Sequence, residues 1–197
     1  MRKKIAIIAA LERELHPLVS SWPSLQVQHE GREFTFYESD YAIAVCSGIG
    51  PEAARRAAQA AVVKYSPAVL ISAGFAGALV PELQAGETIF PALVIDAGDG
   101  SRHETAIRGA PLGSTALGRT ALVSWPEIAG VAQKQQLAKS YGAHAVDMEA
   151  APVARVAQVH GITFLAIKAI SDEMNFEMPE MERFISNGEL QTSRFVL

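Results

Sequence analysis

Residues 4–14 read Lys-Ile-Ala-Ile-Ile-Ala-Ala-Leu-Glu-Arg-Glu. An apolar run that ends abruptly at charged residues is typical of a buried strand whose carboxyl end opens into a polar loop. The positive start of the chain resembles a secretion signal, but charged residues end the apolar run too soon for one. We therefore expect a first strand over Lys4–Ala10 and a helix over Leu11–Ser20, which Pro17 interrupts.

The composition indicates a globular protein with one sizeable core. The 197 residues are 49% hydrophobic and 19% charged, with a net charge of −4, so we expect a single domain over residues 1–197. The 17 lysines and arginines are scattered along the chain, which argues against a nucleic-acid partner. No apolar run approaches the ~18 residues of a membrane span. The sequence predicts a cytoplasmic protein.

The rest of the chain alternates short apolar runs with amphipathic ones, which predicts strands alternating with helices. Further strands are expected over Phe34–Glu38, Tyr41–Ser47, Ala68–Ala73, Glu87–Ile95, Thr120–Ser124 and Thr163–Ile170. Helices are expected over Pro51–Tyr65, Ile128–Tyr141 and Met148–His160. The segment 96–120 is expected to be a loop, and Gly74–Gly77 a turn. The predicted fold class is α/β: a three-layer sandwich whose central mixed, largely parallel sheet is flanked by helices.

Three carboxylates lie at or near predicted strand ends, where α/β proteins bind ligands. They are Glu14, Glu149 and Asp172. Each has an ordinary structural interpretation, as a partner of a helix dipole, a first-turn residue or a turn cap. The glycine segments 47–50 and 74–77 fit neither the dinucleotide fingerprint nor a Walker motif. Viewed singly, none of these features indicates a function.

Taken in order, the motifs resemble the purine nucleoside phosphorylase and nucleosidase superfamily. The similarity is highest to its methylthioadenosine/S-adenosylhomocysteine nucleosidase branch, and looser to nucleosidase-like proteins associated with hopanoid biosynthesis. It covers about two thirds of the chain and rests on five segments in register: residues 4–14, Ser47-Gly48-Ile49-Gly50, Ala73-Gly74-Phe75-Ala76-Gly77, Val146-Asp147-Met148-Glu149 and Lys168-Ala169-Ile170-Ser171-Asp172.

The resemblance implies cleavage of an N-glycosidic bond in a purine nucleoside, with a 5′-substituted adenine nucleoside as the expected substrate. By that resemblance Asp172 protonates the purine at N7, Glu14 activates a water molecule and Glu149 holds the ribose hydroxyls. A raised pKa of Asp172, from burial and neighbouring carboxylates, is expected to keep it protonated. The remaining substrate-binding residues are expected to be Ser47, Phe75, Ala76, Gly77, Trp125, Met148 and Ser171.

Several residues depart from the family pattern. Phe75 stands where the nucleosidase branch has a smaller residue, and Lys168 where arginine is common. The segment 96–145 is shorter than in that branch, and Trp125 is a candidate replacement for its base-stacking aromatic; the alternative is a packed core tryptophan. Two carboxylates around the lone Arg13 make a poor phosphate site, which favours water over phosphate as the nucleophile.

No metal or other cofactor is expected. The five histidines form no metal pattern, and His103 is expected to be a solvated loop residue. Cys46, within an apolar run, is expected to fill the core. Alternatives to the hydrolase are a phosphate-dependent phosphorylase, a nucleoside-binding module without turnover and, with least support, a dinucleotide-binding oxidoreductase. By family resemblance we expect a homodimer.

Overall fold

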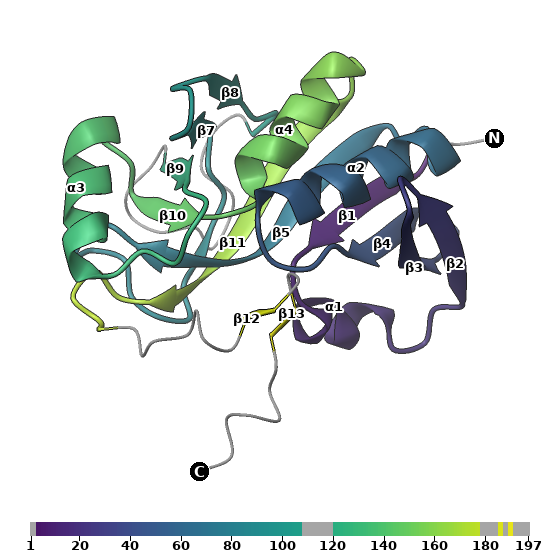
Figure 1. Cartoon of the computed structure of the whole chain (residues 1–197), viewed down its shortest axis with the longest axis horizontal. Helices are drawn as coiled ribbons and strands as arrows, with labels where there is room; N and C mark the ends of the chain where they lie inside the picture. The colour runs from purple at the N-terminus through teal and green to yellow at the C-terminus, as the bar shows by residue number, and fades with distance from the viewer. Residues whose placement is uncertain (1–2, 108–119, 178–184, 187–188, 191–197) are drawn as a thin grey trace, which may run out of the picture.

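The computed structural model describes residues 3–107, 120–177, 185–186 and 189–190. One sheet of eleven strands runs through the molecule (Figure 1). Its strands are β1 (Ile5–Ala9), β2 (Ser24–His29), β3 (Arg32–Glu38), β4 (Ala42–Cys46), β5 (Val69–Ala78), β6 (Thr88–Ile89), β7 (Leu93–Asp96), β8 (Arg102–Glu104), β9 (Ala121–Ser124), β10 (Ala145–Asp147) and β11 (Thr163–Asp172). Two short strands, β12 (Ile185–Ser186) and β13 (Glu189–Leu190), pair separately.

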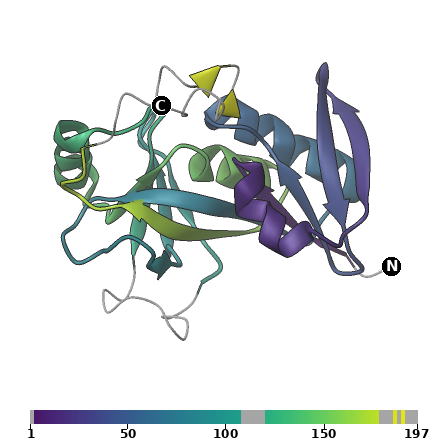
Figure 2. The same cartoon turned by 90° about the horizontal axis from the view of Figure 1, so that it is seen from below.

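Within the described residues, four helices surround the sheet: α1 (Glu12–Val19), α2 (Pro51–Tyr65), α3 (Val131–Tyr141) and α4 (Ala150–Val159). Helices α2 and α4 lie side by side on one face of the sheet, and α1 lies on the opposite face (Figures 1 and 2). Helix α3 packs near β10 at one end of the molecule (Figure 1). None of the helices in the described part of the chain is long and apolar enough to cross a membrane.

The sheet is mixed, with parallel strands at its centre. Strand β1 lies between β4 and β5, and β11 pairs with β5 along most of its length, all in parallel. Strands β2 and β3 continue the sheet antiparallel beyond β4, and β10 meets the end of β5 antiparallel. The carboxyl ends of β1, β4, β5 and β11 therefore meet at one edge. The predicted fold class is confirmed.

Small residues allow α2 to pack closely on the sheet and on α4. Five alanines of α2 are almost completely buried: Ala54, Ala57, Ala58, Ala60 and Ala61. They join one extended core cluster with residues of α4 and the central strands. Because alanine loses no side-chain entropy in a helix, this sequence favours both the helix and its close packing.

The strands depart from the expectations at several points, including the unexpected pair β12 and β13. Strand β2 was not expected, because Ser24–His29 is largely exposed and polar. The predicted strand Glu87–Ile95 is split into β6 and β7 around Pro91, which cannot donate a ladder hydrogen bond. Within the predicted loop 96–120, residues 102–104 form β8, while 108–119 lie outside the described residues. The short strand β10 was also missed, and β5 runs on to Ala78 without a turn at Gly74.

The presence of each helix was predicted correctly, but the positions of several helix ends were not. Helix α2 has the expected bounds, and Pro17 lies inside α1 without ending it. Helix α3 begins three residues later than expected, after Gly130, and α4 begins at Ala150. Element ends are decided by local capping contacts, which periodicity does not show.

Candidate active site

A cavity of about 210 Å³ lies at the edge where the parallel strands end. Backbone and side chains from six separate segments line it, far apart in sequence but adjacent in the fold. The lining residues include Ala10, Leu11, Arg13, Glu14, Ile49, Phe75, Ala76, Gly77, Lys134, Met148, Glu149, Ser171 and Asp172. All three predicted carboxylates therefore face one space.

Glu14 is held at the cavity by two backbone N–H groups. Its Oε2 accepts a hydrogen bond from the Leu11 N–H at 2.8 Å, which caps helix α1, and its Oε1 accepts one from the Phe75 N–H at 3.2 Å. Gly74 lies against the same carboxylate: a Cβ atom there would lie 2.9 Å from Oε1. Strand β5 thus approaches Glu14 so closely that only glycine fits at position 74.

Glu149 lies at the start of α4 and is anchored by the Gly50 N–H, which donates to Oε1 at 2.9 Å. Removal from water raises the pKa of Glu149, and the negative charge of Asp147 raises it further, to about 7. Lys168 and the Gly50 N–H act in the opposite direction but do not outweigh this. Glu149 is therefore a carboxylate that changes charge near neutral pH.

Asp172 ends β11 directly after a β-bulge. The register with β5 shifts between Ile170 and Asp172, so Ser171 is the extra residue and Asp172 stands beside Gly77. The Ser171 hydroxyl donates to Asp172 Oδ1 at 2.5 Å, and the Lys134 ammonium donates to Oδ2. A bulge re-aims the side chains that follow it, which here turns Asp172 toward the cavity. The charged group in direct contact with Asp172 is a lysine, which the sequence analysis did not expect.

A second buried ion pair lies beneath the cavity. Lys168 Nζ contacts Asp147 Oδ2 at 2.9 Å, and both side chains are almost fully buried. Burial alone would lower the pKa of Lys168, but the charges of Asp147 and Glu149 outweigh it and raise that pKa. Asp147 also accepts hydrogen bonds from the Ser124 hydroxyl at 2.6 Å and the Ala150 N–H at 2.8 Å. This network fixes the start of α4 next to Glu149.

Two of the predicted substrate-binding residues lie outside the cavity. Ser47 is fully buried, and its hydroxyl donates to the Ala9 carbonyl at 3.1 Å and to its neighbour's carbonyl. Trp125 lines a separate groove between α2 and α4. Phe75, Ala76, Gly77, Met148 and Ser171 do line the cavity, with Arg13 stacked over the exposed Phe75 ring, 5.5 Å from its centre.

Lys134 was missed by the sequence analysis. It lies on the same side of α3 as Leu137, Ala138 and Tyr141, a spacing of three, four and seven residues. Leu137 is buried, and Ala138 and Tyr141 pack against its cluster. A lysine on the apolar face of a short helix needs a buried partner, and this pattern was the available signal.

The remaining candidates behave as structural residues. His103 is buried in β8 rather than solvated, with its Nε2 3.2 Å from the Ser101 hydroxyl, and burial lowers its pKa. Burial also raises the pKa of the Cys46 thiol, as expected for a cysteine that fills the core. In the part of the chain that the structure describes, no three histidine, cysteine or carboxylate side chains could hold a metal ion together.

Comparison with known proteins identifies the family of this chain. The family model described as Phosphorylase superfamily matches residues 4–122 and 97–196, which together cover nearly the whole chain. The chain belongs to the phosphorylase superfamily. The resemblance inferred from the motifs is thereby confirmed.

Curated relatives of this superfamily member are nucleosidases. It is 24% identical to the aminodeoxyfutalosine nucleosidase of Campylobacter jejuni, over 98% of this chain and 96% of the relative. It is 27% identical to the 5′-methylthioadenosine/S-adenosylhomocysteine nucleosidase of a Shewanella species, over 89% and 86% of the two chains. The solved structure of the Helicobacter pylori methylthioadenosine/S-adenosylhomocysteine nucleosidase superposes with a TM-score of 0.76 at 22% identity, covering 98% and 93%.

Proposed function

We propose that this protein hydrolyses the N-glycosidic bond of a purine nucleoside and releases the free base. One observation carries the proposal: three carboxylates from three distant segments, Glu14, Glu149 and Asp172, line a single cavity at the strand ends. Cleavage of this bond develops positive charge on the ribose and negative charge on the base. A cavity with several carboxylates stabilises the positive ribose, provided that an acid neutralises the base.

Each carboxylate has a distinct role in the proposed reaction. Glu14 takes a proton from a water molecule, whose oxygen then bonds to C1′ of the ribose. The bond between C1′ and N9 breaks, its electron pair stays with the purine, and Asp172 delivers a proton to N7. Glu149 accepts hydrogen bonds from the ribose hydroxyls, and Met148 packs against the sugar.

Water is the proposed nucleophile because the cavity does not resemble a phosphate site. Among the described residues, Arg13 is the one arginine that lines the cavity. Its guanidinium lies over the Phe75 ring, and Glu14 lines the same cavity. A phosphate dianion near two carboxylates would be repelled. Strict dependence of base release on phosphate would show instead that the protein is a phosphorylase.

The substrate is proposed to be an adenine nucleoside with a 5′ substituent, as the names of the curated relatives suggest. Incubation with methylthioadenosine, S-adenosylhomocysteine, adenosine and inosine, each with and without phosphate, tests this. We expect equal base release in both conditions. Tight purine binding without turnover across the panel would favour a binding module instead.

Substitution of Asp172 tests the assignment of the acid. Asp172→Asn keeps the shape and the hydrogen bond from Ser171 but cannot take up a proton and deliver it to the base. We expect base release to fall at least about 100-fold, the usual contribution of a general acid, with an unchanged circular dichroism spectrum. Activity at the wild-type level would contradict the assignment.

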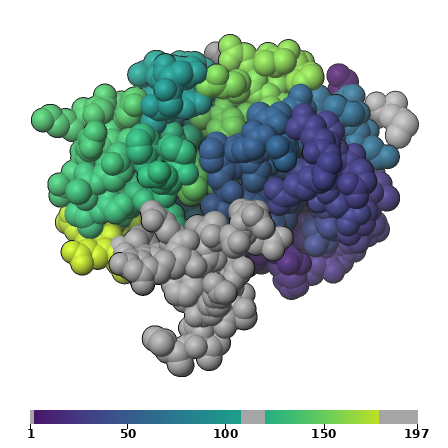
Figure 3. All heavy atoms as spheres, in the orientation of Figure 1, coloured from purple at the N-terminus to yellow at the C-terminus, as the bar shows by residue number. Residues whose placement is uncertain are grey.

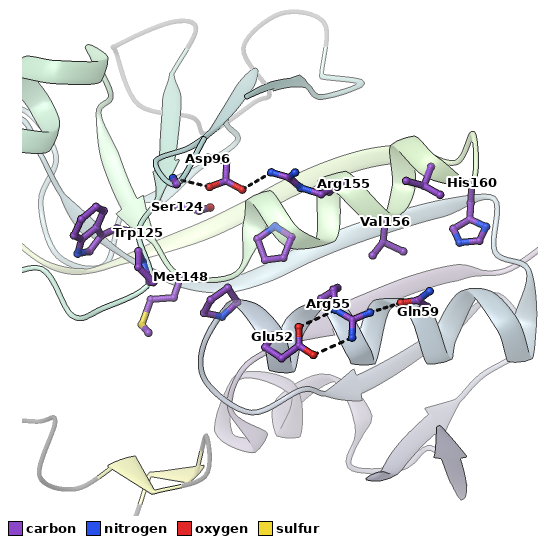
Figure 4. A pocket seen from close by; sticks show the side chains of 15 residues that line it. Glu52, Arg55, Gln59, Asp96, Ser124, Trp125, Met148, Arg155, Val156 and His160 are labelled. Atoms are coloured by element: carbon purple, nitrogen blue, oxygen red, sulfur yellow. Dashed lines mark hydrogen bonds and ion pairs between the residues drawn. The ribbon is translucent and has the colours of Figure 1, made fainter. Parts of the chain in front are cut away.

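We further propose that a second copy of the chain covers the groove between α2 and α4. This groove measures about 510 Å³ and is lined by Pro51, Trp125, Pro152, Val156 and Val159 among others, with Met148 shared with the active-site cavity (Figure 4). The two helices lie next to each other on the molecular surface (Figure 3). An apolar surface of this kind is typical of a contact between subunits.

Sedimentation tests the proposed homodimer. Val159 is 76% exposed at the end of α4, and Val159→Glu should shift the protein from dimer to monomer because it places a charge in the interface. Val63→Glu is the matched control, since Val63 is 68% exposed but does not line the groove. A monomeric wild-type protein would refute the dimer. The cytoplasmic location stays a prediction, which cell fractionation would test.

A further inference from the structure

A buried lysine contacts the proposed acid. The side chain of Lys134 is 1% exposed and that of Asp172 is 5% exposed. Lys134 Nζ donates to Asp172 Oδ2 and, at 2.7 Å, to the carbonyl oxygen of Glu173. A buried ammonium group is stable only with such partners, so the pair accounts for the burial of both charges.

This contact determines which group of the pair carries the transferable proton. In the ion pair Lys134 is the donor and Asp172 the acceptor. As an acceptor on both oxygens, Asp172 has no proton of its own to deliver. Its Oδ1 accepts a hydrogen bond from the Ser171 hydroxyl, and its Oδ2 accepts one from the Lys134 ammonium group. The proton that the departing base needs is therefore stored on the nitrogen of Lys134.

The surrounding backbone leaves room for this pair. A Cβ atom at Gly77 would lie 3.0 Å from Asp172 Oδ2 and 3.2 Å from Cε of Lys134. The bulge at Ser171 places Asp172 next to Gly77 rather than one position further along the ladder. The glycine and the bulge together allow α3 and β11 to bring the lysine and the carboxylate together at the cavity.

We propose, on the basis of the proposed hydrolase function, that Lys134 is a positioning residue that supplies the proton delivered by Asp172. As the C1′–N9 bond breaks, N7 takes a proton from the Asp172 carboxyl group and Asp172 takes one from Lys134 Nζ. The purine leaves neutral, Asp172 is again a carboxylate, and Lys134 is a neutral amine. A proton from solvent restores the ammonium group after the product has left.

The identity of the cation matters for this role. Lysine gives up its proton far more readily than arginine, whose guanidinium stays charged in proteins. Lys134→Gln keeps a hydrogen-bond donor toward Asp172 without a transferable proton. Lys134→Arg keeps the positive charge but holds its proton. If the lysine acted through its charge alone, arginine would replace it.

Two substrates with different leaving groups separate proton supply from structural support. A purine needs protonation to leave, whereas the nitrophenolate of p-nitrophenyl β-D-ribofuranoside leaves as an anion. For Lys134→Gln and Lys134→Arg we expect kcat on the nucleoside to fall at least about 100-fold. We expect KM for the nucleoside, and kcat on the nitrophenyl riboside, to change by less than about threefold, the size of a small local rearrangement.

The assay with the nucleoside and the nitrophenyl riboside also serves for the control variant. Lys139→Gln, on the exposed side of α3, should match the wild-type protein on both substrates, and thermal unfolding checks that each variant is folded. Base release by the wild-type protein tests the hydrolase function itself, while the ratio between variant and wild type tests Lys134. Full nucleoside turnover by Lys134→Arg, or equal losses on both substrates, would overturn the proposal.

Discussion

Single residues in this protein serve the fold and the cavity at once. Glu14 caps α1 through the Leu11 N–H and also faces the cavity. Asp147 accepts the Ala150 N–H at the start of α4 and also holds Lys168. An acidic residue that stabilises a helix start can therefore also contribute to the site.

The charge of Glu149 gives the first prediction at the residue scale. Its pKa is raised to about 7, and the ionised form is the stronger acceptor for the ribose hydroxyls, with both oxygens available as acceptors. We expect kcat/KM to rise as the pH increases through about 7 and then to level off. Glu149→Gln should lose this acid limb together with most of the activity. A pH profile that stays flat between pH 5 and 8 would contradict this assignment.

The same pKa predicts how stability depends on pH. The folded protein binds the proton on Glu149 more tightly than the unfolded chain, whose glutamate has its ordinary pKa near 4.5. The stability contributed by the protonated form is therefore fully present below about pH 4.5 and is lost as the pH rises through about 7. Urea unfolding from pH 4.5 to 8 should show a smaller decline for Glu149→Gln than for the wild-type protein.

Gly74 gives another prediction at this scale. An alanine Cβ would lie 2.9 Å from Glu14 Oε1, so Gly74→Ala should displace the carboxylate and lower kcat about 100-fold. Gly86→Ala is the matched control, because Gly86 also has a positive φ but nothing within 4 Å of the added atom. Equal activity losses in both variants would mean that backbone strain, rather than Glu14, accounts for the effect.

At the scale of elements, buried ion pairs join segments that the sheet alone does not. Lys134 and Asp172 link α3 to the end of β11, and Lys168 and Asp147 link β11 to the junction of β10 and α4. The segments that carry Asp172 and Glu149 are thus each tied to a neighbour by an ion pair, whereas Glu14 is held by backbone N–H groups. This explains how short elements such as β10 hold cavity residues in place.

The pair of Lys168 and Asp147 can be tested by its effect on stability. Lys168→Met leaves Asp147 buried without its cation, so the free energy of unfolding should fall by about 3–5 kcal/mol. Adding Asp147→Asn should recover part of this loss, because no unpaired charge is then buried. Lys64→Met, on the exposed side of α2, should change stability by less than about 0.5 kcal/mol. Urea unfolding curves measure all three.

Periodicity predicted the elements that are either long or buried. The predicted strands Lys4–Ala10, Phe34–Glu38 and Tyr41–Ser47 and the predicted helix Pro51–Tyr65 were correct to within a few residues. Strands β2 and β10 were missed, since one is exposed and polar and the other has only three residues. Such strands form because a neighbouring strand supplies hydrogen-bond partners, which no local pattern records.

At the scale of the whole molecule, we propose that the chain folds as a single domain. Its two tryptophans pack against different core clusters, Trp22 against the cluster that contains Leu15 and Trp125 against the cluster that contains Leu137. Trp22→Phe leaves Trp125 as the fluorescent probe of its cluster, and Trp125→Phe leaves Trp22 as the probe of the other cluster. Coincident fluorescence and circular dichroism midpoints in urea are expected. Separated midpoints would indicate two folding units.

The sequence by itself determined the α/β class, the main strands and helices, and the three carboxylates at strand ends, because apolar periodicity and motif order are local properties of the chain. The tertiary structure decided which of these residues meet. It placed Ser47 and Trp125 outside the cavity, and the bulge at Ser171 set the direction of Asp172. It also brought Lys134 to that carboxylate from 38 positions away, a contact that depends on the packing of α3 and is not encoded in either segment alone.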